Sequence, residues 1–481
     1  MNGQTLHSAP IESKHALIAV AYGLALTAGY LLRIDFTIMA ALSVLPLAIG
    51  ILWSRPIILV LAFIGFSCFR LHEAYPVLMP MHLPLGLAVL SILAASIHLF
   101  GRTVQPFARP ELVFAFLFTA HVTIGLAFAA DRPLAFEYWS SNFIKAAAMC
   151  IIVAWLVKLP DDGNLISNAL AFCGFLLSLV AIYNAINGID LVEGNRISIG
   201  QELKSSISDP NDLAFVLMFA VAFSVGIFFS AQTSVMGRIS ISVVLVLMFW
   251  AIIATKSRGG LLGVLAVLGV YFARRYRSFM LPMLVCVVAG AALYTLADIA
   301  GRSYSNDVIG STTLDDSSNG RLYYWLAAFQ MALHRPIFGI GLHNFEDMMW
   351  SYVLIWDGRS HVAHSIWFTV LGETGFVGLA LYMGMILNAF RSVFGIFAKL
   401  DAVGADERTR TFALALAAGF AGTCVAGTFL TQSYSWPVFM QVALIAALAQ
   451  HVDSLQRVHR PGLAADAVER AAPVYGPLRT A

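Results

Sequence analysis

The stretch DLAFVLMFAVAFSVGIFFSA, residues 212–231, decides the fold class of this chain. Its one charged residue is the aspartate at the start, and a helix of this length crosses the hydrocarbon core of a bilayer, which takes about 20 residues. Similar runs recur throughout the 481 residues, of which 59% are apolar and 12% are charged. With a mean hydropathy of +0.80, such a chain cannot bury its apolar surface in a water-soluble core, so an integral membrane protein is predicted.

We predict an all-α polytopic membrane protein with about 12–14 transmembrane helices. The apolar runs behind this number lie at roughly residues 16–33, 35–53, 56–69, 77–100, 110–130, 136–157, 165–187, 212–231, 238–255, 259–273, 279–299, 376–395, 410–430 and 436–451. The runs at 56–69 and 259–273 are short for a straight crossing, which leaves the lower number open. The N-terminal segment has no basic stretch followed by a small-residue cleavage site, so the first span is predicted to be retained.

The orientation follows from the basic residues, which gather at every second connection. They are Lys14, Arg55, Arg102, Arg109, Lys158, Arg238, Arg274, Arg275, Arg277, the residues from Arg391 to Arg410, Arg457 and Arg460. The positive-inside rule places these connections and both termini in the cytoplasm. The segments 188–211, 256–258 and 300–375 then face the outer side of the membrane.

This topology divides the chain into four parts. Residues 1–299 hold the first eleven of the predicted spans and the small outer loop 188–211. Residues 300–375 form a large outer loop that contains helices and carries the candidate site. Residues 376–452 hold the last spans, and residues 453–481 are a cytoplasmic tail that we predict to be disordered.

Two common classes of site are not indicated by the composition. The cysteines, Cys68, Cys150, Cys173, Cys286 and Cys424, lie in or beside apolar runs without a CxxC spacing, so neither a disulfide framework nor a metal site is predicted. The net charge of +2 gives no indication of a nucleic-acid partner.

The outer segments carry an unusual set of cations. Arg196 lies in the middle of the first segment, and Lys256 and Arg258 stand before paired glycines in the second; at such positions, arginines and lysines also serve simply as interfacial charges. The third segment holds His334, His343, His361 and His364 with Arg321, Arg335 and Arg359. In it, NGRLYYWLAAFQMALH has helical spacing and ends before Pro336.

His364 begins a short apolar segment, HSIWFTVLG, that GETG at residues 372–375 separates from the next span. We expect this segment to lie at the outer membrane surface, with Trp367 as its interfacial anchor. An imidazole is thereby placed at the depth of the lipid headgroups.

A lipid-linked diphosphate is the substrate that this set of residues fits best. Because no nucleotide sugar is supplied outside the cytoplasmic membrane, an enzyme that acts there needs a donor that is already activated. Arginine binds phosphate oxygens through two parallel hydrogen bonds and stabilises the charge that grows on a leaving diphosphate. Histidine is the usual base for an acceptor hydroxyl.

Four stretches taken together carry a family resemblance. They are GNRISIG with DPNDLA, then SRGGLLG, then GRLYYW followed by HRPIFGIGLHNF, and finally AHSIWFTVLGETGFVGLALY. In this order and on the outer side, over about residues 190–395, the sequence resembles the O-antigen ligase and polymerase superfamily of bacterial inner-membrane proteins.

The resemblance implies a glycosyltransferase of the GT-C kind that needs no metal or other cofactor. It implies that a glycan moves from undecaprenyl diphosphate to lipid A core, to another glycan or to a protein, at the periplasmic face of the inner membrane. The catalytic residues that it implies are His364, Arg258 and Arg196, and the substrate-binding residues are Arg321, His361, Gly339 and Gly341. The sequence departs from the family at Ser365, where the family has asparagine, so the role of this neighbour is open.

Other interpretations stay open at this point. A ligase and a polymerase share their donor and differ in the acceptor, and the sequence favours the ligase only narrowly. A transporter or flippase also suits many spans, with Lys145 and His121 as its intramembrane candidates. His361 and His364, three residues apart, would share a helix face and bind a metal with Glu346 or Asp347, but no metal motif accompanies them.

Overall fold

The computed structural model describes residues 54–276 and 318–459, apart from positions 204, 206, 354, 355 and 357, together with Gly23, Thr27 and Gly50. Its helices are α3 (Ile57–Ser67), α4 (Leu71–Ala74), α5 (Leu83–Phe100), α6 (Pro110–Gly125), α7 (Arg132–Tyr138), α8 (Ile144–Leu156), α9 (Asp161–Asn187), α10 (Pro210–Phe229), α11 (Val235–Ala254), α12 (Arg258–Tyr276), α15 (Ser318–His334), α16 (Phe345–Met348), α17 (Ile366–Val403), α18 (Glu407–Gly427) and α19 (Trp436–His459). One antiparallel hairpin joins β1 (Leu191–Val192) to β2 (Arg196–Ile197). The prediction of an all-α polytopic membrane protein is confirmed.

Nine helical segments in the described ranges are long and apolar enough to cross a membrane. They are α5, α6 with its 3-10 extension, α7 joined to α8, α9, α10, α11, α17, α18 and α19. The predicted spans at 16–33, 35–53 and 279–299 lie outside the described residues, as do residues 300–317 and the tail beyond 459. Each of the other predicted runs coincides with a helix, and the short ones at 56–69 and 259–273 form α3 and α12. The total number of spans stays a prediction.

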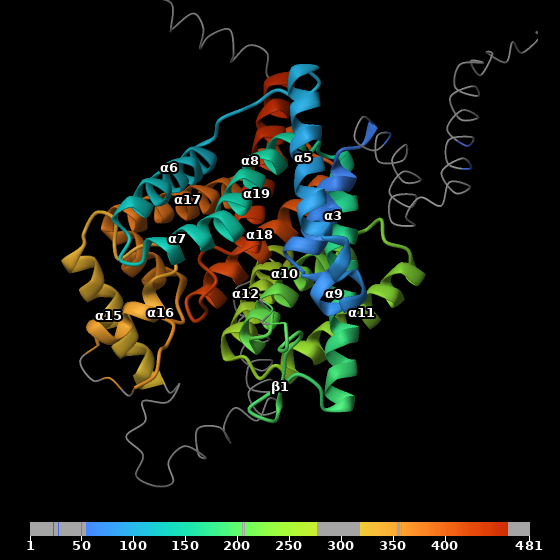
Figure 1. Ribbon diagram of the computed structural model, residues 1–481. Helices are drawn as coiled ribbons and strands as arrows, with labels where there is room; N and C mark the ends of the chain where they lie inside the picture. The colour runs from blue at the N-terminus through green and yellow to red at the C-terminus, as the bar shows by residue number, and fades with distance from the viewer. Residues whose placement is uncertain are drawn as a thin grey trace, which may run out of the picture.

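The helix α10 occupies the centre of the bundle (Figure 1). Every side chain from Leu213 to Phe223 is buried, as expected for a helix that is apolar all round and enclosed by its neighbours α9, α11, α12 and α18. Small residues let these helices approach closely, since a Cβ atom added at Gly174 of α9 would lie 2.5 Å from Ala220 of α10. By contrast, α5 and α11 at the periphery expose apolar residues such as Leu85 and Val246, which suit contact with lipid.

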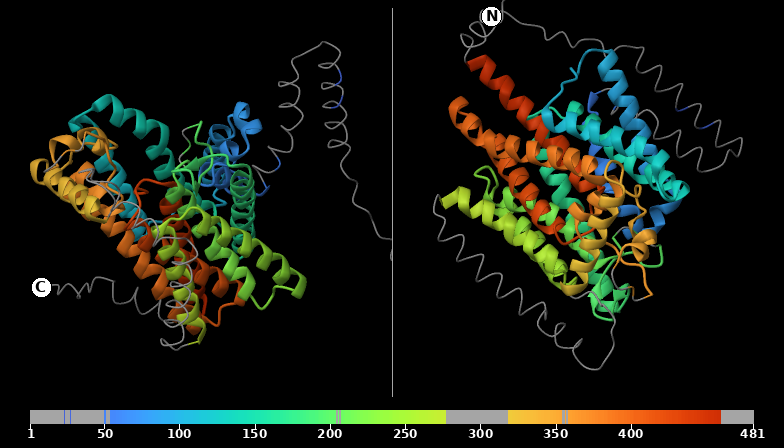
Figure 2. Two further views of the ribbon diagram at one scale, coloured as in Figure 1. Left: turned by 90° about the horizontal axis from the view of Figure 1, so that it is seen from below. Right: turned by 90° about the vertical axis from the view of Figure 1, so that its left-hand side faces the viewer.

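A break at Gly375 divides α17 into two helical parts. Gly375 has φ 71° and ψ −173°, whereas the residues on either side are helical. The predicted separation of the short segment 364–372 from the following span therefore has its counterpart in the structure. All four residues of the GETG stretch are buried, and α15 packs along α17 beside them, on the flank of the bundle seen in Figures 1 and 2.

The turn before α16 is hydrogen-bonded to this break. The amides of Ile340 and Gly341 donate to the carbonyls of Gly372 and Glu373 at 3.0 Å each, and the Phe376 amide donates to the Pro336 carbonyl at 2.8 Å. These bonds satisfy backbone groups that the break removes from the helix. Because Gly375 has a positive φ and a Cβ atom there would lie 2.5 Å from the Pro336 oxygen, only glycine fits.

Gly375→Ala is expected to destabilise the protein by on the order of 3 kcal/mol. The added methyl group would clash with the Pro336 carbonyl oxygen, and alanine is strained at a positive φ. The measurement is the thermal unfolding midpoint of the detergent-purified protein. Gly395→Ala, in the same helix with nothing within 4 Å of the added Cβ, is the matched control and should be neutral or stabilising. Equal midpoints for both variants would show that the break does not depend on glycine.

Candidate active site

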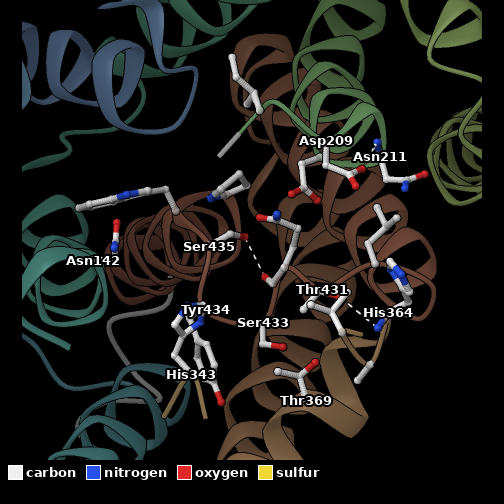
Figure 3. Close-up of a pocket in the computed structure, with 18 of the residues that line it drawn as sticks. Asn142, Asp209, Asn211, His343, His364, Thr369, Thr431, Ser433, Tyr434 and Ser435 are labelled. Carbon is white, nitrogen blue, oxygen red and sulfur yellow. Dashed lines mark hydrogen bonds between the residues drawn. The ribbon is translucent and has the colours of Figure 1, made fainter. Parts of the chain in front are cut away.

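A cavity of about 530 Å³ lies where five separated parts of the chain meet (Figure 3). Its polar and charged lining consists of Arg70, Tyr138, Asn142, Asp209, Asn211, Asp212, His343, Glu346, His364, Thr369, Glu373, Thr431, Gln432, Ser433, Tyr434 and Ser435, with the thiol of Cys68 and the hydroxyl of Ser67. Each contributing segment is, or adjoins, a connection that the basic residues predict on the outer side. We call this space the central cavity.

His364 borders the central cavity at the start of α17. Its backbone amide donates a 3.1 Å hydrogen bond to Thr431 Oγ1, drawn in Figure 3. Trp367 Nε1 donates to Thr428 Oγ1 at 3.1 Å, and Ser433 Oγ donates to the Ile366 carbonyl at 3.1 Å. The connection between α18 and α19 therefore holds the backbone around His364 and leaves its half-buried imidazole at the cavity.

The interpretation of His361 and His364 as residues on one helix face is wrong. Residues 361–364 are not helical, because α17 begins only at Ile366, after Ser365. The His361 ring stacks on Tyr324 of α15 with 4.9 Å between ring centroids, and His361 is not among the residues that line the central cavity. Within the described ranges, no group of three or more His, Cys, Asp or Glu is placed to hold a metal.

Arg196 lies behind the wall of the central cavity. Its side chain is 6% exposed, and it donates through Nε to the Thr255 carbonyl and through Nη2 to Asn211 Oδ1, at 3.1 Å each. Asn211 itself lines the cavity. Arg196 also pairs with Glu193 at 3.6 Å, so the small hairpin is fastened both to the cavity wall and to the connection before α12.

Arg258 is the first residue of α12, three positions after Thr255, so the structure brings it to the region of Arg196. Its side chain is exposed and is not among the residues lining the central cavity. The helix start is packed tightly against α10, since a Cβ atom at Gly260 would lie 2.5 Å from Ala214. Arg196 thus adjoins the cavity wall through Asn211, and Arg258 begins the helix that follows its partner Thr255.

The remaining predicted residues do not line the central cavity. Arg321 sits half-buried in the first turns of α15. Gly339 and Gly341 have φ of 63° and 109°, and Cβ atoms there would lie 2.4 Å from Glu373 and Ala129 respectively. These glycines allow the turn to contact the α17 break closely, and their part in substrate binding stays a prediction.

Glu373 and Tyr434 also line the cavity and were not predicted from the sequence. Glu373 is 3% exposed, and its Oε1 accepts a 3.3 Å hydrogen bond from the Phe345 amide. Its Oε2 and the Tyr434 hydroxyl are both buried, and the two groups interact electrostatically. Burial, together with the neighbouring Glu373, raises the pKa of Tyr434 well above its usual range, so its hydroxyl keeps its proton. Glu373 is the one acid between His364 and Gly395, which is the signal that would have drawn attention to it.

A second histidine, His343, lines the same cavity. Its ring stacks on Tyr138 of α7 with 4.2 Å between centroids. Burial is the main cause that lowers the pKa of His343, opposed by Glu346 and Asp347. His343 is therefore neutral at pH 7 and offers hydrogen bonds without a charge.

Comparison with known protein families gives one match. Residues 243–383 match the family model described as O-antigen ligase. The matched range runs from α11 into α17 and includes Arg258, His343, His364 and Glu373, whereas Arg70, Arg196 and the α18–α19 connection lie outside it. The comparison with curated proteins found no match. The resemblance predicted from the sequence is confirmed over this range.

Proposed function

Because residues 243–383 match the O-antigen ligase family, we propose that the protein moves a glycan from an undecaprenyl-diphosphate-linked donor to an acceptor at the periplasmic face of the bacterial inner membrane. The observation that carries this proposal is the central cavity, where His364 of the matched range meets polar groups from the rest of the chain. The match itself supports ligase-type or polymerase-type chemistry on lipid-linked glycans. The donor, the acceptor and the membrane face are our proposal.

In the proposed reaction, the acceptor hydroxyl attacks the anomeric carbon of the donor sugar. The new glycosidic bond forms as the bond from that carbon to the phosphate oxygen breaks, and the diphosphate leaves with the bonding electrons. His364 takes the proton of the attacking hydroxyl as general base. No step in this scheme uses a metal or another cofactor.

The leaving diphosphate is assigned to the arginine side of the cavity. Arg258, whose side chain is exposed, has a planar guanidinium that can donate two parallel hydrogen bonds to phosphate oxygens. Arg196 is already fixed by Thr255 and Asn211, so it supplies a positive charge in a set position as the leaving group gains negative charge.

Ligase and polymerase activity are separated by the acceptor. Purified protein in lipid is given undecaprenyl-diphosphate glycan and either lipid A core or a second lipid-linked glycan, and the products are resolved by mobility. We expect a new product with lipid A core. Product only with the second lipid-linked glycan would make the protein a polymerase, and no product with any acceptor would contradict the proposed enzyme activity.

The proposed periplasmic face gives a topological prediction. In cells, Asn195→Cys in the β1–β2 hairpin should react with a membrane-impermeant maleimide, whereas Ala231→Cys, between α10 and α11, should react only after the membrane is opened. The reason is that the basic residues alternate along the chain. Both positions are exposed, and the unsubstituted chain gives the background of the native cysteines.

Equal labelling of both cysteines in intact cells would contradict this topology. Reporter fusions give an independent check. A reporter after Arg277 should behave as cytoplasmic, and one near Ser317 as external.

A further inference from the structure

A second cavity, of about 300 Å³, borders the central cavity. The two share Ser67, Arg70, Asn142 and Trp436 in their linings, so these residues form the wall between them. We call the second space the lateral cavity. It lies between the α3–α5 connection and the beginning of α8, outside the range that matches the family model.

The charges that line the two cavities differ in sign. The lateral cavity has Arg70 and Lys145 and, among its described lining residues, no carboxylate. The central cavity has four carboxylates, Asp209, Asp212, Glu346 and Glu373, with Arg70 as its only described arginine or lysine. An anion is therefore favoured on the lateral side of the shared wall.

The Lys145 ammonium of the lateral cavity is available to a ligand. Lys145 is exposed and makes no hydrogen bond or ion pair with the described part of the chain, although it lies within a candidate span. Arg70 Nη1 pairs with Glu73 at 3.2 Å. His72, 9% exposed, keeps its Nδ1 without a hydrogen-bond partner among the described residues. A buried polar atom of this kind calls for a partner.

One wall of the lateral cavity is apolar and suits contact with lipid. It includes Met79, Pro84, Leu85 and Ala88, of which Leu85 is 60% exposed. Leu85 continues along α5 into Val89 and Ile92, which are also exposed. On the opposite side, a π-helical turn, Trp139–Phe143, shifts the backbone just before Lys145, a deviation often found at functional sites. The cavity thus combines a cationic interior with a hydrocarbon-facing mouth.

We propose that the lateral cavity binds the phosphate group of the membrane lipid that carries the acceptor. Arg70 and Lys145 hold the phosphate, the lipid chains lie along the exposed face of α5, and the attached glycan passes the shared wall into the central cavity. This inference rests on the proposed function for the role of that glycan, and it gives the acceptor a phosphate site separate from the donor site near Arg196 and Arg258.

The test measures lipid binding rather than transfer. Native mass spectrometry of the purified protein counts bound diphosphorylated lipid A, undecaprenyl diphosphate and phosphatidylglycerol, each titrated separately. Undecaprenyl diphosphate can also occupy the donor site, so two molecules per chain are expected if it is the acceptor carrier as well. For lipid A, one molecule per chain is expected.

The lateral site should depend on its two cations. Arg70→Gln with Lys145→Gln should remove one bound molecule of the lipid that carries the acceptor, and each single change should weaken that binding by about 10-fold. Lys145→Gln alone keeps the test independent of folding, because that side chain has no partner to lose within the described residues. Arg238→Gln changes an exposed arginine in the first turn of α11, at the predicted cytoplasmic side, and should leave binding unchanged.

The outcomes separate this inference from the proposed function. Unchanged binding of lipid A and of undecaprenyl diphosphate in the double variant overturns the lateral site, as does an equal loss of phosphatidylglycerol, which would indicate a general anionic surface. Binding that depends on Arg70 and Lys145 in a protein that transfers no glycan would support the site and refute the proposed function.

Discussion

His364→Asn is expected to lower glycan transfer by about 10²-fold or more, because it removes the base that accepts the proton of the attacking hydroxyl. Asparagine is chosen because residue 364 has φ 47°, a conformation that asparagine tolerates better than most residues. The bond to Thr431 comes from the backbone amide, so the substitution leaves it in place. The measurement is the transfer rate of purified protein at saturating donor and acceptor.

His361→Ala is the matched control for this change. His361 stacks on Tyr324 and does not line the central cavity, so its loss should reduce transfer by less than about 10-fold. Transfer by His364→Asn within a few-fold of the unsubstituted protein would exclude His364 as the base. Equal losses in both variants, restored by added zinc or manganese, would indicate a metal site instead.

Arg258→Lys is expected to lose most of the glycan transfer, nearly as much as Arg258→Ala. A lysine ammonium keeps the charge but cannot form two parallel hydrogen bonds to phosphate oxygens. Loss of one charge-assisted interaction costs about 1.5–3 kcal/mol, which is roughly 10- to 150-fold in rate if the interaction forms mainly in the transition state. The assay is the same transfer reaction, with product read by mobility.

The alternative for Arg258 is an interfacial charge, for which lysine serves about as well as arginine. Near-normal transfer by Arg258→Lys would show that Arg258 is an interfacial charge and that it does not bind the diphosphate. Arg238→Lys, at an exposed arginine in the first turn of α11, is the control for a substitution of the same kind away from the cavity.

Helices were the most predictable feature of the fold, because an apolar run of about 20 residues is typical of a membrane-spanning helix. The run at 212–231 became α10, and the helix predicted before Pro336 became α15, which ends at His334. The break in α17 was also predictable, since GETG interrupts an apolar run with two glycines and an acid.

The contacts between distant segments could not be read from local patterns. Arg196 donates hydrogen bonds to Asn211 and to Thr255. The sequence around Arg196 does not predict either of these partners. The same holds for Arg70, which reaches the central cavity from the α3–α4 connection. Such contacts depend on how helices pack. The spacing of apolar residues predicts which face of a helix is buried, but it does not predict which other helix covers that face.

The spacing of His361 and His364 shows the limit of periodicity. An interval of three residues places side chains on one face only if the backbone is helical. Here α17 begins after Ser365, so the two imidazoles belong to an extended segment with different neighbours: Tyr324 for His361, and the central cavity for His364.

We propose that the glycosidic bond is made in the central cavity. Its most direct test is to supply purified protein in vesicles with radiolabelled undecaprenyl-diphosphate glycan and acceptor, and to follow both the label and the release of undecaprenyl diphosphate. We predict that label appears on the acceptor with an equal amount of undecaprenyl diphosphate released, and that both disappear in His364→Asn. Movement of intact glycan lipid between the leaflets, without release of undecaprenyl diphosphate, would contradict the claim and make the protein a flippase.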